Sequence, residues 1–488
     1  MAPYPDNAHE TKPAPWADLF RDGRGVYTVS LSLGIALHAM DAFVVSTVMP
    51  TVVADIGGAA FYAWVVMLYM TASIIGAASG GPVKLMFGAR RGYVAAGLLF
   101  LVGTMISALA PVMPILLTGR VVQGFGVGMI VAQNVALISE LFPGNMRVRM
   151  ITVTSGVWAA AALVGPMIGG IFAEFDWWRG AFWFGVPIIL FFTVSAWRAL
   201  PDTRPEHVIP LSRFPIGRVV LLGVGVLAIG ATGNIDALSA RLAALTFGFI
   251  LIWLTIRLDH TAENRIFPSR PFSLTGPVGT AYWIFLLLTM APMTAGIYLP
   301  LAYQILHGLS PLAAGYLAAL LAVAWSAAAV LTSMLHGGGV RVAVVGGPAL
   351  TTIGLVGIAL TVATGPILTI AAFTIVTGAG IGLCTSHLMN WTMSMAAPGE
   401  ESITASSIQT MRSLGIAIGA AGAGLIANMA GLGSGVTAVT VSTAVSWVIG
   451  IFTLAPLCVV GLGFLLVWHR HRHLRTGAHA RPAAAPGK

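Results

Sequence analysis

Residues 111–140 read PVMPILLTGRVVQGFGVGMIVAQNVALISE, and the following apolar run ends in Gly165-Pro166-Met167-Ile168-Gly169-Gly170. Arg120 stands inside the first run, where a fixed charge is costly unless it faces the protein interior and has a partner. The Gly-Pro-x-x-Gly-Gly run lacks side-chain bulk and one backbone donor. A neighbouring helix can therefore approach closely, and the helix that carries the run bends. Both features indicate the core of a transporter rather than of an enzyme.

Composition places most of the chain in lipid. The 488 residues are 57% hydrophobic and 8% charged, whereas soluble proteins carry roughly 25% charged residues. The net charge of +9 does not indicate nucleic-acid binding, because the positive residues lie in short connections between apolar runs. Cys384 and Cys458 lie inside apolar runs, where we expect packing rather than a disulfide or a metal site. The sequence has no phosphate-binding Gly-x-x-x-x-Gly-Lys loop, no metal-spaced His/Cys cluster and no Gly-x-Ser-x-Gly elbow, so we expect neither metal nor enzymatic activity.

At about 20 residues per span, the apolar runs predict an all-α polytopic membrane protein with about fourteen spans, grouped as six, two and six. The predicted spans lie near 27–50, 60–82, 93–110, 112–140, 150–173, 180–199, 217–235, 241–257, 275–303, 311–335, 340–362, 365–390, 404–430 and 446–468. The resulting division is an N-terminal segment 1–26, a six-helix bundle 27–200, a loop with two extra helices and a linker 201–274, a second six-helix bundle 275–468 and a basic tail 469–488.

Basic residues predict the orientation of the chain. An even number of spans with Lys and Arg in alternate connections places both termini in the cytoplasm. Residues 15–21 form either a short interfacial helix, with Trp16, Leu19 and Phe20 among the headgroups, or a disordered segment. We expect no cleavable signal peptide, and a disordered tail after Trp468. The basic residues of the alternating connections are Lys12, Arg21, Arg24, Lys84, Arg90, Arg91, Arg147, Arg149, Arg198, Arg204, Arg213, Arg257, Arg265, Arg270, Arg341, Arg470, Arg472, Arg475 and Arg481.

Six motifs follow one another in an order typical of one transporter family. They are Asp41 nine residues before Pro50, Arg120-Val-Val-Gln123-Gly124-Phe-Gly126, Gly165-Pro166-x-x-Gly169-Gly170, Trp178-Arg179 through Pro187, Tyr298-Leu-Pro300 through Gly315, and Arg412-Ser-Leu-Gly415 followed by Gly419. On these motifs, from about Asp41 to Leu466, the chain resembles the major facilitator superfamily, specifically its fourteen-span drug:proton antiporters.

This resemblance implies two six-helix bundles plus two extra linker helices, and export of amphiphilic or lipophilic molecules by alternating access. It implies a bacterial cytoplasmic (inner) membrane, a proton gradient as the driving force, and no cofactor. The expected partners are the small-molecule substrate, protons and the lipid bilayer, with a monomer as the default state. Residues that the resemblance assigns to helix packing or gating are Gly81, Gly88, Arg90, Arg91, Gly124, Gly165, Pro166, Gly169, Gly170 and Arg412.

One connection departs from the pattern of the family. The loop between the second and third spans normally contains an acidic residue followed by an arginine, but Leu85 and Met86 stand at those positions here. In the family, that acid helps to lock the cytoplasmic side. The lock is therefore either weaker in this chain, or Lys84 has taken its place.

Asp41 and Arg120 are the predicted proton-coupling pair. Asp41 lies nine residues before Pro50 and Arg120 nine residues after Pro111, on spans that run in opposite directions. Both therefore lie roughly 14 Å below the same surface, and a substrate that disturbs their contact would change how Asp41 holds a proton. A purely structural ion pair is the alternative. His38 lies one turn before Asp41 and either relays protons or packs through a hydrogen bond.

The substrate is expected near mid-membrane, between the two bundles. Arg412 has no obvious carboxylate nearby. Its side chain either donates to backbone carbonyls, takes part in an inner gate or binds an anionic group of the substrate. Glu140 is expected to contact Arg147 or Arg149. Few acidic residues lie deep in the spans, which disfavours a site for strongly cationic drugs. Candidate substrate-lining residues are Trp64, Tyr69, Gln133, Asn134, Trp283, Met290, Met293, Tyr298, His387, Asn390 and Trp391, each of which has plain helix packing as its alternative.

Two other functions remain open at this point. A lipid or amphipathic-metabolite exporter of the same fold would have wide, apolar lateral openings between spans. A membrane sensor or scaffold that transports nothing would keep its function when Asp41 and Arg120 are neutralised.

Overall fold

The computed structural model describes residues 15–202 and 214–479, so the sequence-based assignments at Lys12, Arg204, Arg213 and Arg481 lie outside the described residues. The elements of the described part are helices, and fourteen stretches are long and apolar enough to cross a membrane, as the sequence predicts. The chain is therefore a multi-pass membrane protein. The spans follow the predicted grouping of six, two and six.

The first bundle contains α1 (Arg24–Ile56), α2 (Trp64–Phe87), α3 (Ala89–Ala108), α4 (Met113–Leu141), α5 (Gly144–Glu174) and α6 (Trp178–Ala199). The second contains α9 (Pro277–His307), α10 (Pro311–Thr332), α11 (Gly338–Thr361), α12 (Ile367–Ser394), α13 (Glu401–Met429), and α14 (Ala438–Phe452) followed by α15 (Leu454–His479). Helices α14 and α15 together form the last span, which is interrupted at Thr453.

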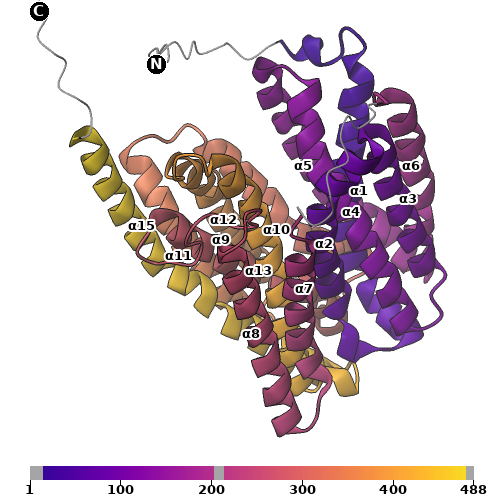
Figure 1. The fold of residues 1–488 in the computed structure, drawn as a ribbon. Helices are drawn as coiled ribbons and strands as arrows, with labels where there is room; N and C mark the ends of the chain where they lie inside the picture. The colour runs from indigo at the N-terminus through magenta and orange to yellow at the C-terminus, as the bar shows by residue number, and fades with distance from the viewer. Residues whose placement is uncertain (1–14, 203–213, 480–488) are drawn as a thin grey trace, which may run out of the picture.

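The two extra helices, α7 (Ile216–Ala231) and α8 (Leu238–His260), lie between the bundles in sequence and in space (Figure 1). Helix α7 packs against α2 of the first bundle and α13 of the second, while α8 packs mainly against α7. Most side chains of α8 are consequently exposed to what would be lipid. The extra pair therefore covers one side of the junction between the bundles.

The segment after α8 is fastened to both the extra pair and the second bundle. Buried Asp259 accepts backbone hydrogen bonds from Ile266 (2.8 Å) and Phe267 (2.9 Å) and forms an ion pair with Arg218. Farther along, the Ser269 amide and hydroxyl donate to the Glu400 carboxylate, which stands between α12 and α13. A movement of the second bundle would therefore carry this connection with it.

The two bundles contact each other at one end of the molecule. We call the end at which α1 begins and α15 ends the terminal face, and the opposite end the far face (Figure 1). At the far face, the Asn428 side chain donates a 2.9 Å hydrogen bond to the Ala60 carbonyl, and the rings of Tyr62 and Tyr298 stack with centroids 5.4 Å apart. Each of these contacts joins the first bundle to the second.

The Gly-Pro-x-x-Gly-Gly run makes the closest of these far-face contacts. A methyl group on Gly170 of α5 would lie 2.5 Å from the Leu312 Cα of α10, and one on Gly315 would lie 2.8 Å from the Thr47 side chain and 3.1 Å from Pro166. Any larger residue would force the helices apart, since carbon atoms do not pack so closely. Pro166 and Gly170 thus pack at the junction of the bundles, while Gly165 and Gly169 pack against α1 within the first bundle.

The bundles separate toward the terminal face. On the terminal half of α5, Ile151 is 57% exposed and Trp158 is 38% exposed, and at the terminal end of α10 Leu331 and Met334 are almost fully exposed. Figure 1 shows α5 diverging from the second bundle toward the terminal face. The structure is therefore a conformation that is closed at the far face and open at the terminal face.

The segment before α1 differs from the interfacial helix considered above. Residues Trp16–Leu19 form a single 3-10 turn, and Leu19 is fully buried in the first bundle. The Thr28 hydroxyl donates to the Leu19 carbonyl at 2.8 Å, and Arg149 lies over the ring of Trp16. Leu19 is thus a core residue rather than a headgroup anchor, while Trp16 and Phe20 remain exposed.

Candidate functional site

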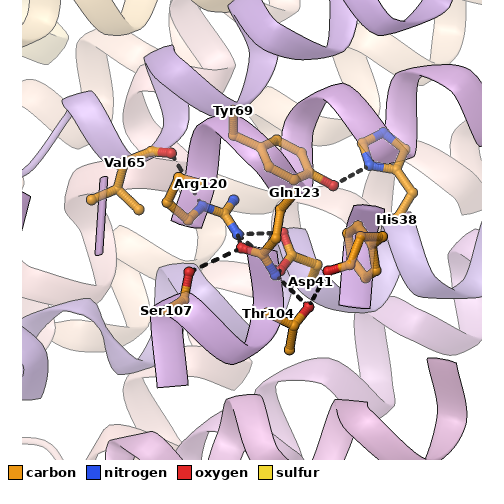
Figure 2. Close-up of polar contacts among 9 residues, drawn as sticks. His38, Asp41, Val65, Tyr69, Thr104, Ser107, Arg120 and Gln123 are labelled. Carbon is orange, nitrogen blue, oxygen red and sulfur yellow. Dashed lines mark hydrogen bonds and ion pairs between the residues drawn. The ribbon is translucent and has the colours of Figure 1, made fainter. Parts of the chain in front are cut away.

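Asp41 of α1 and Arg120 of α4 meet in the first bundle, as their predicted depth requires. The Arg120 Nη1 atom lies 2.9 Å and 2.8 Å from the two carboxylate oxygens of Asp41 (Figure 2). The Arg120 side chain is 2% exposed and that of Asp41 is 8% exposed. A charge pair this deeply buried is stable only when its remaining donors and acceptors also have partners.

Those partners come from three helices. The Arg120 guanidinium donates to the Gln123 side chain at 2.9 Å and to the Val65 carbonyl of α2 at 3.3 Å, and it lies 4.1 Å from the centre of the Tyr69 ring. Gln123 in turn donates to the Thr104 hydroxyl of α3 at 2.9 Å. Arg120 is therefore held in place even without Asp41.

Gln123 and Thr104 belong to the site, but the sequence analysis did not assign them to it. Gln123 stood in the motif that begins at Arg120, and it follows Arg120 by three residues, so the two share a helix face. No comparable signal points to Thr104 or to Ser107, because both reach the site from a different helix. Such pairings depend on how α3 packs against α4.

His38 joins the site through Tyr69. The His38 Nδ1 atom lies 2.9 Å from the Tyr69 hydroxyl (Figure 2). The Tyr69 hydroxyl interacts in turn with the Asp41 carboxylate. The other neighbour of the imidazole is the edge of the Trp158 ring on α5, with centroids 5.3 Å apart. Tyr69 is completely buried, so the structure places it in the ion-pair cluster rather than on a substrate-lining wall.

A small cavity lies beside Asp41. Its volume is about 50 Å³, and its polar lining comes from Asp41, Thr104 and Gln123, while Phe182 and Phe184 of α6 form part of its apolar wall. This space is sufficient for water, and three polar side chains are enough to hold it. The Asp41 carboxylate thus borders a water-sized space that Tyr69 does not line.

Two predicted substrate residues of the first bundle have structural roles instead. Gln133 donates to the Gly92 carbonyl of α3, and Asn134 donates to the Leu31 carbonyl of α1 at 2.7 Å. Both are buried, and their amides donate to backbone carbonyls where helices cross, as buried polar groups require. Trp64 is half-buried with its ring edge against Phe61, at the far face.

In the second bundle, predicted substrate-lining residues also have structural contacts. The Trp283 indole donates to the Phe272 carbonyl, and His387 bonds to the Thr332 carbonyl at 2.9 Å. Tyr298 belongs to the stacked pair at the far face, Trp391 is covered by the Arg470 guanidinium, and Asn390 is exposed. Met290 packs against the core, and Met293 is half-buried on the same helix, so these two methionines remain candidates.

Arg412 of α13 lacks the kind of partner that Arg120 has. Within the part of the chain that the structure describes, its guanidinium forms no hydrogen bond or ion pair with another side chain or with a backbone carbonyl. It lies 5.6 Å from the centre of the Trp325 ring on α10 and is half-buried. The backbone-carbonyl role considered for it is therefore not found in this conformation.

The connection between α2 and α3, which departs from the family pattern, is paired with another helix of the first bundle. Lys84 of α2 pairs with Glu140 of α4, so Glu140 meets Lys84 and not the predicted Arg147 or Arg149. Leu85, at the position of the family's acid, is exposed. In this conformation Lys84 is thus paired within the first bundle.

The remaining packing and gating residues divide into two groups. The Arg90 side chain donates to the Leu200 carbonyl at 2.7 Å and, like Arg91, lies about 4 Å from Asp202. Gly88 ends α2 with a positive φ of 85°, and Gly124 abuts the Tyr69 carbonyl so closely that no side chain would fit. The close-packing positions are Gly124, Gly165, Gly169 and Gly170, whereas Gly81 has no neighbour within 4 Å.

Comparisons with known proteins agree with this architecture. The chain matches the family model described as Major Facilitator Superfamily over residues 31–420. It is 31% identical over 442 residues to a protein named "Probable multidrug-efflux transporter" from Mycobacterium tuberculosis, which covers 87% of this chain and 92% of the relative. It is also 26% identical over 304 residues to "Multidrug resistance protein 3" of Bacillus subtilis, covering 59% of this chain and 57% of the relative.

Solved structures with low sequence identity share the fold. A D-xylose-proton symporter aligns with a TM-score of 0.62 at 16% identity, covering 89% of this chain and 97% of the symporter. The human organic anion transporter MFSD10 aligns with a TM-score of 0.54 at 15% identity, covering 89% of this chain and 99% of that protein. From the family match and the Mycobacterium relative, this chain belongs to the Major Facilitator Superfamily of transporters.

Proposed function

We propose that the protein is a proton-coupled exporter, which exchanges protons for amphiphilic or lipophilic molecules by alternating access in a bacterial cytoplasmic membrane. The observation that carries the proposal is the buried pair between Asp41 and Arg120. An ionisable group inside a membrane protein is costly and is usually retained for function. The relative named as a multidrug-efflux transporter supports drugs as the exported class.

The pair can act as a switch between two states. When Asp41 is ionised, Arg120 donates to both carboxylate oxygens and so joins α1 to α4. A proton that binds one of these oxygens makes the group neutral, and the Coulomb attraction to Arg120 is lost. Arg120 stays charged and keeps Gln123 and the Val65 carbonyl as partners. Protonation therefore loosens the α1–α4 contact without leaving the guanidinium bare.

The conformation described above would be the one that loads substrate. Its open terminal face is the side that the basic connections assign to the cytoplasm. A molecule that enters there favours release of the proton from Asp41 into the cytoplasm. After the bundles rock and the far face opens, the molecule leaves and Asp41 takes up a proton from outside.

The proton would reach Asp41 along His38 and Tyr69. Their contacts form a continuous line from the Trp158 side of α5 to the carboxylate. Tyr69→Phe keeps the ring beside Arg120 and removes only the hydroxyl, so we expect slower proton exchange with little loss of stability. A wild-type rate in this variant would exclude the route and leave the cavity on the α6 side as the path.

The test is substrate-driven proton movement in proteoliposomes that enclose a pH-sensitive dye. Ethidium, chloramphenicol, dansylglycine and a short-chain phospholipid supply a cationic, a neutral, an anionic and a lipid candidate. We expect at least one of them to drive proton movement in the wild type and none to do so in Asp41→Asn.

The matched control is Asp55→Asn. Asp55 is on the same helix and also forms an ion pair, with Arg179 at 2.6 Å, but it lies at the far-face end. Proton movement that persists in Asp41→Asn and not in Asp55→Asn would contradict the assignment. Absence of proton movement with every compound would contradict proton-coupled export of these classes.

A further inference from the structure

Arg412 of the second bundle is a positive charge near the middle of the α13 span, and it has no negative partner among the described residues. Arg412 lies eleven residues after Glu401, the first residue of α13, which corresponds to a depth of roughly 16 Å. Among the acidic residues that the structure describes, Asp41 is the one placed well inside a span, and Arg120 already neutralises it. The other acidic residues stand near helix ends or in connections. No described carboxylate can therefore balance Arg412.

The surroundings of Arg412 are built as one half of a binding site. The guanidinium extends from α13 toward the Trp325 ring of α10, with 5.6 Å between Cζ and the ring centre. Helix α13 itself packs on α9, whose Thr289 donates to the backbone carbonyl of Arg412 and not to its side chain. One wall is thus a flat aromatic face, and beside it stands a set of unused N–H donors.

Packing alone does not account for this arrangement. A cation over an aromatic ring gains about 0.5–2 kcal/mol, whereas a charged side chain near the centre of a membrane costs at least about 2.5 kcal/mol. An uncharged side chain would fill the same space at lower cost. A bound anion would offset the part of the burial cost that the contact with the Trp325 ring does not recover.

We propose that Arg412 and Trp325 bind the carboxylate-bearing end of an anionic amphiphile whose aromatic body stacks on Trp325. The planar guanidinium donates two parallel hydrogen bonds to a carboxylate, and such charge-assisted bonds are about twice as strong as neutral ones. This inference rests on the proposed function only for the claim that substrates pass between the bundles. The proposed site would favour substrates with a single negative charge and repel cations.

Access to the site is consistent with the open conformation. Arg412 is half-buried, and the exposed terminal halves of α5 and α10 lie on the side from which a cytoplasmic molecule would arrive. The far-face contacts of Tyr62 with Tyr298 and of Asn428 with Ala60 close the opposite end. A ligand at Arg412 would therefore be bound above a closed far face.

The experiment compares two probes that differ in one charge. Dansylglycine carries a carboxylate, and dansylglycinamide has the same aromatic body without charge. Binding to the full-length protein in phosphatidylcholine nanodiscs is followed by dansyl fluorescence, with empty nanodiscs subtracted. We expect the wild type to bind dansylglycine about 10- to 100-fold more tightly than the amide, which is the range for one charge-assisted contact.

Arg412→Gln should reduce this preference to near unity, and Arg412→Lys should retain part of it. The control is Arg241→Gln, because Arg241 bonds the Ile235 carbonyl at the far-face end of α8 and has no contact with the site. Trp325→Ala should weaken both probes alike. Equal binding of the two probes by the wild type, no binding of either, or an unchanged preference in Arg412→Gln would overturn the proposal. The wild-type ratio decides even if a variant does not fold.

This outcome is separable from that of the proton assay. Loss of charge preference in Arg412→Gln with proton movement intact for chloramphenicol would establish the anion site independently of coupling. Proton movement that survives Asp41→Asn would remove the coupling assignment and leave the binding ratio unaffected.

Discussion

The two bundles each place one arginine inside a span, but they give it different surroundings. In the first bundle, Arg120 has the Asp41 carboxylate, a glutamine, a backbone carbonyl and an aromatic ring as partners. In the second, Arg412 has the aromatic ring alone among the described residues. A cation that the protein balances internally serves a switch, whereas one left unbalanced serves a partner that comes and goes.

The difference has a thermodynamic consequence. Removing one member of a buried ion pair leaves the other charge uncompensated, which costs several kcal/mol. Removing an arginine that has no acidic partner removes a burial cost instead. The same substitution should therefore have opposite effects in the two bundles.

The largest expected effect is at the pair. Arg120→Gln should destabilise the protein by about 3–5 kcal/mol, while Arg412→Gln should leave its thermal stability unchanged or slightly raised. Thermal unfolding in detergent, followed by tryptophan fluorescence, measures both. Adding Asp41→Asn to Arg120→Gln should recover most of the lost stability. Equal destabilisation by the two arginine substitutions would contradict the proposed difference between the paired Arg120 and the unpaired Arg412.

A second prediction concerns the closed far face, which joins the bundles. Gly170→Ala places a methyl group 2.5 Å from the Leu312 Cα, whereas Gly81→Ala meets nothing within 4 Å. Such overpacking costs about 1–3 kcal/mol, so Gly170→Ala should shift the population toward open far faces by about 5- to 150-fold. Spin labels at Phe175 and Val439, in a background of Cys384→Ser and Cys458→Ser, report this distance.

The control Gly81→Ala should keep the wild-type distance distribution. A distribution for Gly170→Ala that matches the wild type would show that the far-face contact does not depend on this glycine.

The smallest expected effect is at the terminal face. Lys84 pairs with Glu140 inside the first bundle, near the surface, and such exposed pairs contribute about 0.2–1 kcal/mol. Lys84→Gln should therefore change stability and proton movement little. A several-fold change in the proton movement would mean that Lys84 acts as the lock that Leu85 cannot provide.

The sequence predicted the framework well because its signals are local. Fourteen spans follow from the length of apolar runs, and the meeting of Asp41 with Arg120 follows from counting residues along two helices that run in opposite directions. The Gly-Pro-x-x-Gly-Gly run predicted a close helix contact, which the structure shows between Gly170 and Leu312.

The walls of the site were harder to predict. Depth along a helix can be counted, but the face that a residue presents depends on helix rotation and on its neighbours. Asn134 was expected to contact substrate and instead bonds the Leu31 carbonyl, and Tyr69 was expected on the same wall but lies in the ion-pair cluster. Each of these residues interacts with a helix that is distant in sequence.

The most direct test of the central claim, that Asp41 exchanges its proton when substrate binds, is proton release from purified protein in weakly buffered detergent solution. A pH indicator would follow the addition of whichever compound drives proton movement in proteoliposomes. We predict proton release from the wild type and from Asp55→Asn, and none from Asp41→Asn under saturating ligand. Release from Asp41→Asn equal to that of the wild type would contradict the account and leave the Asp41–Arg120 pair as a structural contact.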